Sequence, residues 1–342
     1  MMAEQLTNGH TSSVLCLDVQ RQTEQLASGG ENGELCIWSL VDKSLQKKYV
    51  QLDCDCTSVC FSKINPNLLY AAFGEKILVF NTEQFAEPEH TYDYNTDEIN
   101  QIILNNNEEN LAACDDSGEV KIINLLEKKM FRTLRNKHTN ICSTIIFRPN
   151  RQQDIVSAGL DGKLIHWLYP NHKCLNQFNM QELLNTPEDA SAYMVNPPFI
   201  HHMACSPNGT YIACGMQNGQ IAVFNGNRKN LSQLFNLHAH TQGVSQVTFC
   251  DETHLISGGN DCQLIVWDLS KAENLENLEN GSSANGHGSP LDHRNAQITH
   301  LCKEQSFNHP MKINWLDYFC RNEIRYLLVA DQTMCISVLP IS

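Results

Sequence analysis

The sequence predicts an all-β protein built as a seven-bladed β-propeller, and three observations support this prediction. A set of four residue types recurs along the 342-residue chain at nearly constant spacing. Short apolar or alternating runs, separated by Gly, Pro, Asn and Asp, recur at roughly the 40–45-residue period of propeller blades. Long helical periodicity is nowhere evident. Short strands at regular intervals, with no helices between them, favour a propeller among the all-β folds.

The recurring set is clearest in the segment SAGLDGKLIHW. Trp167 ends this segment, Asp161 lies six positions earlier, Ser157 ten positions earlier, and His138 nineteen positions before the serine. The segments SGGNDCQLIVWD and SGGENGELCIW repeat the spacing, the second with Asn at the acidic position. The residues of these two further sets are His240, Ser257, Asp261 and Trp267, and His10, Ser28, Asn32 and Trp38.

Weaker copies of the set fill the gaps and bring the number of units to seven. DDSGEVKIIN and CGMQNGQIAVFN keep the spacing with other residues, whereas AAFGEKILVFN and VADQTMCISVL have turns one residue shorter. The predicted blades span residues 10–51, 52–94, 95–135, 138–179, 196–237, 240–302 and 309–342, with 2–7 added to the last.

The two ends of the chain predict how the ring closes. The last unit offers three strands, Ile313–Tyr318, Tyr326–Ala330 and Met334–Leu339, and lacks a fourth. Met2–Thr7 precede the first histidine of the repeat and belong to no blade of their own. We therefore expect this N-terminal strand to complete the last blade, so that the ring has no large open edge.

Two long connections interrupt the regular strands. We expect Met180–Pro198, between the fourth and fifth blades, to be either a solvated connector or a loop that contacts a partner. Lys271–Asn295 is polar and ends in a Gly/Ser-rich run, so it cannot bury enough apolar surface to order itself alone. We expect a disordered insertion there, serving as a tether or as a docking motif that folds on binding, followed by a fourth strand at Gln297–Cys302.

The amino-acid composition limits the classes of binding partner and the cellular compartment that we expect. The net charge of −14 and the pI of about 5.4 argue against a uniform basic footprint for nucleic acid or anionic lipid. No apolar run approaches the ~20 residues that cross a bilayer, and the start of the chain does not resemble a secretory signal. The fifteen cysteines are scattered, mostly inside apolar runs. We expect reduced, buried thiols in an intracellular protein of the cytoplasm, the nucleus or both, not a secreted one.

The His, Ser and Asp of the repeat invite comparison with a hydrolase, but a structural role fits them better. Catalysis needs an exposed nucleophile beside an oxyanion hole, and it needs that site once. Here the trio occurs in full twice, and each serine precedes an apolar strand. We therefore predict no catalytic residues, no enzymatic activity and no cofactor, and keep the hydrolase as a distant third alternative.

Candidate metal sites are equally weak in the sequence. Cys54, Cys56 and Cys60 could share one face of an extended segment, but they lack a fourth ligand and CxxC-type spacing. His201 and His202 are adjacent on a predicted strand, so they point to opposite faces, one toward the channel and one toward the core. We predict packing roles for these residues and no bound metal.

On these residues the chain resembles the WD-repeat β-propellers from end to end, in segments such as NGHTSSVLCLDV, KHTNICSTIIFRP, LISGGNDCQLIVWD and VADQTMCISV. The resemblance implies that His, Ser, Asp and Trp of a blade form a structural hydrogen-bond chain. Such a buried polar network is tolerable when its members satisfy one another. It also implies a non-enzymatic scaffold that binds proteins, as a monomeric propeller within a complex.

Many members of this family are substrate receptors of cullin-4 RING ubiquitin ligases and dock on the adaptor DNA damage-binding protein 1. The family's adaptor signature is Trp-Asp-x-Arg at the end of a third strand. This sequence departs from it, because Ser270 stands where the Arg belongs and Lys271 follows one place late. Trp267, Asp268 and Lys271 are the candidate adaptor contacts, and a scaffold in another complex with no ubiquitin-ligase role is the alternative.

Overall fold

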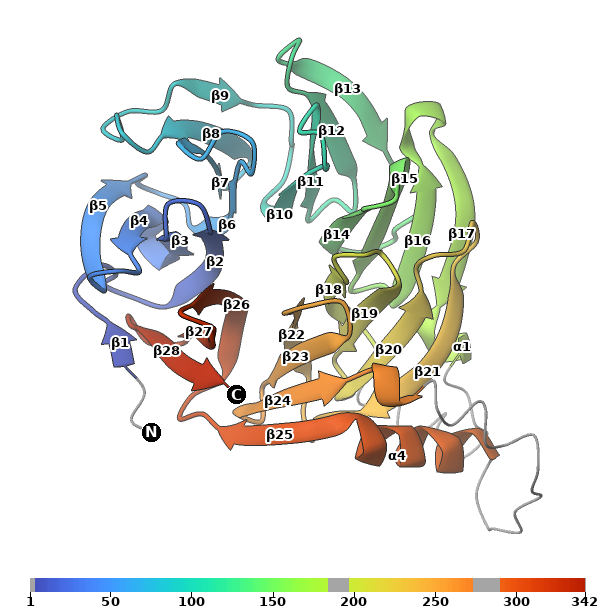
Figure 1. Cartoon of the computed structure of the whole chain (residues 1–342). Coiled ribbons are helices and arrows are strands. Elements are labelled where there is room, and N and C mark those ends of the chain that lie inside the picture. Colours follow the sequence, from blue (N-terminus) through green and yellow to red (C-terminus); the bar gives the residue numbers. More distant parts are fainter. Residues whose placement is uncertain (1–3, 184–196, 273–289, 342) are drawn as a thin grey trace.

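The chain folds into a ring of seven β-sheets, as the computed structural model shows for residues 4–183, 197–272 and 290–341 (Figure 1). Each sheet is a blade of four antiparallel strands, so the predicted propeller is confirmed. Blades one to three comprise β2 (Val14–Gln20), β3 (Gln25–Gly30), β4 (Glu34–Ser39) and β5 (Ser44–Val50); β6 (Cys56–Phe61), β7 (Leu68–Phe73), β8 (Lys76–Asn81) and β9 (His90–Tyr92); and β10 (Ile99–Leu104), β11 (Asn110–Asp115), β12 (Val120–Asn124) and β13 (Lys129–Leu134).

The remaining blades follow the same order along the chain. They comprise β14 (Cys142–Arg148), β15 (Arg151–Gly159), β16 (Lys163–Leu168) and β17 (Lys173–Asn179); β18 (Ile200–Cys205), β19 (Tyr211–Met216), β20 (Gln220–Asn225) and β21 (Ser232–His238); β22 (Val244–Phe249), β23 (His254–Gly259), β24 (Gln263–Asp268) and β25 (Lys303–Asn308); and β26 (Ile313–Arg321), β27 (Ile324–Asp331), β28 (Ile336–Ile341) and β1 (Glu4–Leu6). Short helical turns are η1 (Glu31–Gly33), η2 (Tyr169–Asn171) and α1 (Met180–Leu183).

The N-terminal strand closes the ring, as the sequence predicts. β1 pairs antiparallel with β28, with Glu4 opposite Val338 and Leu6 opposite Ile336. Leu6 is fully buried in the apolar cluster between blades one and seven. The first and last strands of the chain therefore share one sheet, and the closure does not depend on a covalent link (Figure 1).

Apolar side chains gather between the blades rather than in one central core. In the described residues, seven buried clusters form, and each draws its members from two neighbouring blades. The middle strands are buried on both faces, whereas an outer strand such as β5 alternates between exposed and half-buried residues. Each blade thus depends on both neighbours for the burial of its faces.

Polar side chains on the inner strands tie adjacent blades together. Asp18 accepts a hydrogen bond from the backbone N–H of Phe61 in the next blade over 2.6 Å, and Gln101 accepts one from Ile145 over 2.7 Å. The other acceptors of this inner belt are Ser58, Thr144 and Asp317, bonded to Ile102, Met203 and Val19 respectively. The side chains of this belt thus accept hydrogen bonds from backbone N–H groups on the inner strand of the neighbouring blade.

One predicted strand is wrong. Gln297–Cys302 lie in helix α4 (Pro290–Cys302), and the fourth strand of blade six is β25, which begins one residue later. Of the expected disordered insertion, 273–289 lie outside the described residues, whereas 290–295 form the start of α4, so that part of the expectation is wrong too. Ile298 and Cys302, four positions apart, face the apolar cluster between blades five and six.

Helix α4 covers the open edge of blade five, next to β21 (Figure 1). Asn295 Oδ1 accepts a hydrogen bond from the N–H of Asn236 over 3.1 Å, and Thr299 Oγ1 accepts one from the N–H of His238 over 3.0 Å. Side chains of a helix thus replace a neighbouring strand at this edge. Within the described ranges, no helix is long and apolar enough to cross a membrane.

Candidate functional site

In blade four, the four predicted residues form one buried hydrogen-bond chain. His138 Nε2 lies 2.8 Å from Ser157 Oγ, and its Nδ1 lies 3.1 Å from Asp161 Oδ1. The indole N–H of Trp167 donates to the same serine oxygen over 2.9 Å. This chain connects the segment before β14 with β15, the following turn and β16.

Blade six repeats this geometry almost atom for atom. His240 lies 2.8 Å from Ser257 Oγ and 2.9 Å from Asp261 Oδ1, and Trp267 donates to Ser257 over 2.9 Å. Burial opposes ionisation of Asp261, but the hydrogen bonds from His240 and from the N–H of Thr241 outweigh it and lower the pKa of this carboxyl to about 2. The carboxylate is therefore charged at neutral pH and orients the imidazole.

In blade one, a residue other than the expected Asn32 lies beside the histidine of the chain. His10 lies 2.6 Å from Ser28 Oγ, and Trp38 donates to the same oxygen over 2.8 Å. Asn32 is not part of the chain, because it occupies a left-handed turn and its N–H donates to Asp55. Glu34, two residues later, brings its Oε2 to 3.5 Å from His10 Nδ1.

Blades three and seven contain reduced versions of the chain that sequence reasoning missed. His309 Nε2 lies 2.7 Å from Asp331 Oδ2, and Asn95 Nδ2 donates to Asp115 Oδ2 over 2.8 Å. Both carboxylates end the second strand instead of sitting in the turn after it. The spacing of 22 residues between His309 and Asp331 falls between those of blades four and six, and this signal could have found the pair.

None of the chains in blades one, four and six presents a nucleophile. Ser28, Ser157 and Ser257 have no exposed surface. Each hydroxyl oxygen is already bonded to an imidazole and an indole. A buried hydroxyl held by two partners holds strands together and cannot attack a substrate.

The candidate adaptor contacts differ in exposure: the side chains of Trp267 and Asp268 are covered, whereas that of Lys271 is accessible. Trp267 is fully buried in its blade, so its assignment as a surface contact is wrong. Asp268 is half-buried, and its Oδ1 accepts from the backbone N–H of Ser270 over 3.0 Å. The side chain of Lys271 is 41% exposed, with its ammonium 2.7 Å from Glu304 and 3.7 Å from Asp268. Of the three, Lys271 alone offers a charged group that a partner can reach directly.

The adjacent histidines of β18 take different positions. His202 is buried and belongs to the inner belt: it lies 3.3 Å from Gln101 of blade three and its ring packs against Trp315 of blade seven. His201, on the opposite face of the strand, lies 2.5 Å from Gln217 of the same blade. Contacts among blades three, five and seven therefore cross the centre of the ring at this level.

Residues considered for metal binding are occupied in other ways. Burial raises the pKa of the Cys54, Cys56 and Cys60 thiols, which keeps them protonated at neutral pH. In the described part of the chain, the side chains of His254, Asp268 and Glu304 lie close enough together to share a cation. The ammonium of Lys271 already lies against the two carboxylates of this group.

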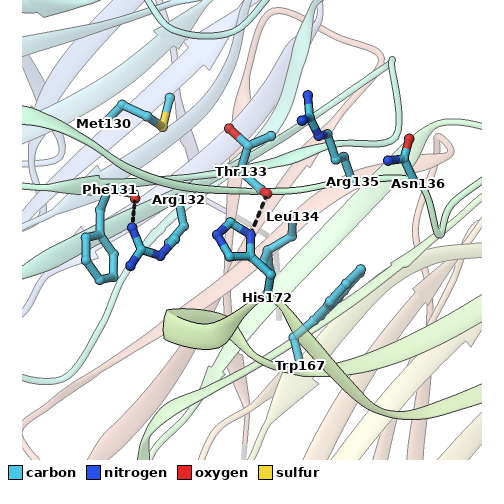
Figure 2. Close-up of a pocket in the computed structure, with 9 residues that line it drawn as sticks. All are labelled: Met130, Phe131, Arg132, Thr133, Leu134, Arg135, Asn136, Trp167 and His172. Carbon is cyan, nitrogen blue, oxygen red and sulfur yellow. Dashed lines mark hydrogen bonds between the residues drawn. The ribbon is translucent and has the colours of Figure 1, made fainter.

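A basic groove runs between blades three and four. It encloses about 510 Å3 between outer strand β13 and the turn of blade four, lined by Met130, Phe131, Arg132, Thr133, Leu134, Arg135, Asn136, Trp167 and His172 (Figure 2). No carboxylate lines it. His172 Nδ1 donates to the carbonyl of Thr133 over 3.1 Å, which joins the turn to the open edge of β13.

Sequence reasoning missed this groove, although the sequence contains a signal for it. Residues 128–153 include seven Lys and Arg and no Asp or Glu, in a chain whose net charge is −14. The segment covers β13 and the following inner strand, β14. An acid-free stretch of this length in an acidic protein indicates a local basic surface.

An acidic groove of about 670 Å3 lies between blades one and two and reaches the start of blade three. Its lining includes five acidic side chains and no Lys or Arg: Asp53, Asp55, Glu75, Asp97 and Glu98. Burial, with the nearby Asp116, Asp55 and Asp97, raises the pKa of Glu98 above its usual range. The ring thus has two grooves of opposite charge on different blades.

Comparison with known proteins places the chain in a family. The model of the WD domain, G-beta repeat, matches residues 3–39 and 231–268. The chain is 31% identical over 293 residues to WD repeat-containing protein 53 homolog of Dictyostelium discoideum, which covers 78% of each chain. This protein belongs to the WD-repeat β-propeller family, whose members generally act as non-enzymatic scaffolds that bind other proteins.

More distant relatives share parts of the chain. Guanine nucleotide-binding protein subunit beta-1 of Drosophila melanogaster is 25% identical over 165 residues, 46% of this chain and 44% of that protein. Pre-rRNA-processing protein IPI3 of Mycosarcoma maydis is 30% identical over 109 residues, 32% of this chain and 18% of that protein. The recurrence of the repeat in proteins with such different names agrees with a scaffold on which function lies in surface positions.

Proposed function

We propose that this protein is a scaffold that holds two protein partners at once, as a substrate receptor of a cullin-4 RING ubiquitin ligase docking on DNA damage-binding protein 1. The observation that supports a two-partner scaffold is the pair of oppositely charged grooves on one closed ring. Complementary charge selects partners and speeds their association. A receptor needs separate surfaces for its adaptor and its substrate, and the two grooves add to the loop that carries Lys271.

The adaptor role is supported by the resemblance to WD-repeat ligase receptors and opposed by the missing Arg. A planar guanidinium forms two parallel hydrogen bonds with a carboxylate, which a Lys cannot reproduce. Lys271 supplies a single exposed cation on the same loop. Docking through this surface would therefore depend on the ammonium of Lys271, where receptors with the Trp-Asp-x-Arg signature use the guanidinium of an Arg.

Direct binding to the purified adaptor tests the proposal. We expect full-length protein to bind immobilised DNA damage-binding protein 1 and Lys271→Glu to bind about tenfold or more weakly. Lys312→Glu, an equal change of charge at another exposed lysine, serves as the control. If the wild type does not bind the adaptor, the ligase role fails and the chain is a scaffold of another complex.

An intracellular setting is part of the proposal. All fifteen cysteines are free thiols, and most of them are buried or half-buried, as reducing compartments permit. Imaging of the tagged full-length protein tests this setting and measures its division between nucleus and cytoplasm. Secretion of the chain into the medium would contradict it.

A further inference from the structure

The basic groove contains an arginine whose orientation is fixed without a counterion. The guanidinium of Arg132 donates from Nε to the carbonyl of Pro170 over 2.9 Å and from Nη1 to the carbonyl of Phe131 over 2.8 Å. It also stacks over the Phe131 ring at 4.3 Å. By contrast, Arg21, Arg148, Arg321 and Arg325 each lie within 4.0 Å of a carboxylate oxygen.

Both hydrogen bonds of Arg132 end on neutral carbonyls, so its charge is oriented but not neutralised. Arg135 lies on the same wall and is exposed, and Figure 2 shows its side chain extending free of β13. Because no Asp or Glu lines the groove, both guanidinium groups are available to an anion from outside. Carboxylates match the planar fork of such groups.

The shape and lining of the groove indicate what carries that anion. β13 is the outer strand of blade three, so one of its edges pairs with no strand. Met130, Phe131 and the buried Leu134 and Trp167 give the groove an apolar component beside its cations. An extended chain with carboxylates and an apolar side chain is complementary to both features. A nucleic acid is a poorer match, because the net charge of −14 repels its phosphates outside the groove.

We propose that the basic groove binds an extended acidic peptide segment of a partner protein, with its carboxylates on Arg132 and Arg135. The proposal rests on the scaffold role and specifies the chemistry of one partner. Asp and Glu side chains of the segment bind the guanidinium groups, and an apolar side chain between them packs on Met130 and Phe131. The Lys271 loop remains available to the adaptor, and the acidic groove on blades one and two remains unassigned.

Fluorescence anisotropy with a labelled peptide of four Asp-Asp-Leu repeats tests this assignment on the full-length protein. We expect the peptide to bind the wild type, and a Lys-Lys-Leu peptide to lack groove-dependent binding. Arg135→Glu, at an exposed side chain, and Arg132→Gln should each weaken the acidic peptide about tenfold or more. The matched control Lys229→Glu, at an exposed lysine of blade five outside the groove, should change affinity by less than about twofold.

Three results would overturn the assignment. They are an acidic peptide that does not bind, equal binding by the wild type and Arg135→Glu, or tighter Arg135-dependent binding of a single-stranded oligouridine. Thermal unfolding of Arg132→Gln checks that its carbonyl contacts are not needed for folding, and Arg135→Glu carries the test if they are. Adaptor binding by Arg135→Glu separates the two proposals: it should persist while peptide binding is lost.

Discussion

At the scale of single residues, the serine of each hydrogen-bond chain in blades one, four and six bonds to two side chains. Ser157 joins an imidazole and an indole while fully buried, so its removal leaves the Trp167 N–H and Nε2 of His138 without this partner. We expect Ser157→Ala to lower the free energy of unfolding by about 1–3 kcal/mol, measured by urea denaturation. The exposed Ser44→Ala should change it by less than about 0.5 kcal/mol. Equal stability of the two variants would show that the hydrogen-bond chain does not stabilise the blade.

A second residue-scale effect concerns the inner belt. Burial, together with the nearby Asp317 carboxylate, raises the pKa of Asp18 from 3.8 to about 7. Between these two values the folded state holds a proton that the unfolded state has lost, so stability falls as the pH rises from about 4 to about 7. The amide of Asp18→Asn keeps an acceptor for the N–H of Phe61 and does not titrate.

We therefore expect the free energy of unfolding of Asp18→Asn, taken relative to that of the wild type, to rise by about 1–2 kcal/mol from pH 5 to pH 8. Urea denaturation at both pH values measures this difference. Asp93→Asn, which removes an exposed carboxylate of the Lys76 ion pair, should show the pH dependence of the wild type. A constant difference between Asp18→Asn and the wild type across the range would contradict the assigned titration.

At the scale of elements, three residues of β1 close the ring. Leu6 is buried between blades one and seven, so Leu6→Ala should cost about 2–5 kcal/mol. Deletion of Met2–Thr7 should lower the midpoint of thermal unfolding by at least as much as Leu6→Ala does, because the edge of β28 then loses its partner. Glu4→Ala, at an exposed position of the same strand, should change little. An unchanged midpoint after the deletion would argue against closure by β1.

Helix α4 is the second element whose role can be tested. Thr299 Oγ1 accepts the N–H of His238 on the edge of β21, and Thr299→Val removes this acceptor while keeping the shape of the side chain. We expect faster hydrogen exchange at the His238 amide in Thr299→Val and wild-type exchange in Thr299→Ser, which keeps the hydroxyl. Equal exchange in both variants would show that the helix does not protect this edge.

These elements also show which parts of the structure the sequence could predict. The blades could be predicted because each repeats a local pattern of strands and turns, to which blades one, four and six add the His, Ser and Trp of the hydrogen-bond chain. Gln297–Cys302 occupies the place where the repeat calls for a fourth strand. The segment is nevertheless helical, because Ile298 and Cys302 reach the same apolar cluster when they lie one helical turn apart. Glu34 could not be preferred to Asn32 from spacing alone, since the choice depends on which side chain the turn directs at His10.

At the scale of the whole molecule, the ring places residues together that no local pattern connects. The two grooves form where loops and edges of neighbouring blades meet, so their linings combine segments from separate repeats. Charge counting could have indicated residues 128–153, but only the fold joins Arg132 to Pro170 and Thr133 to His172. The scaffold function belongs to this level, because rigidity comes from the seven inter-blade clusters and specificity from the surfaces between them.

The most direct test of the scaffold account is affinity purification of the tagged full-length protein from its own cells, with quantitative mass spectrometry of the bound proteins. The account predicts that DNA damage-binding protein 1 and cullin-4 are recovered near stoichiometry with at least one further protein. That further protein should be depleted in a parallel purification of Arg135→Glu, while the adaptor is retained. Recovery of the chain alone, without enriched partners, would contradict the claim that this propeller acts by holding other proteins together.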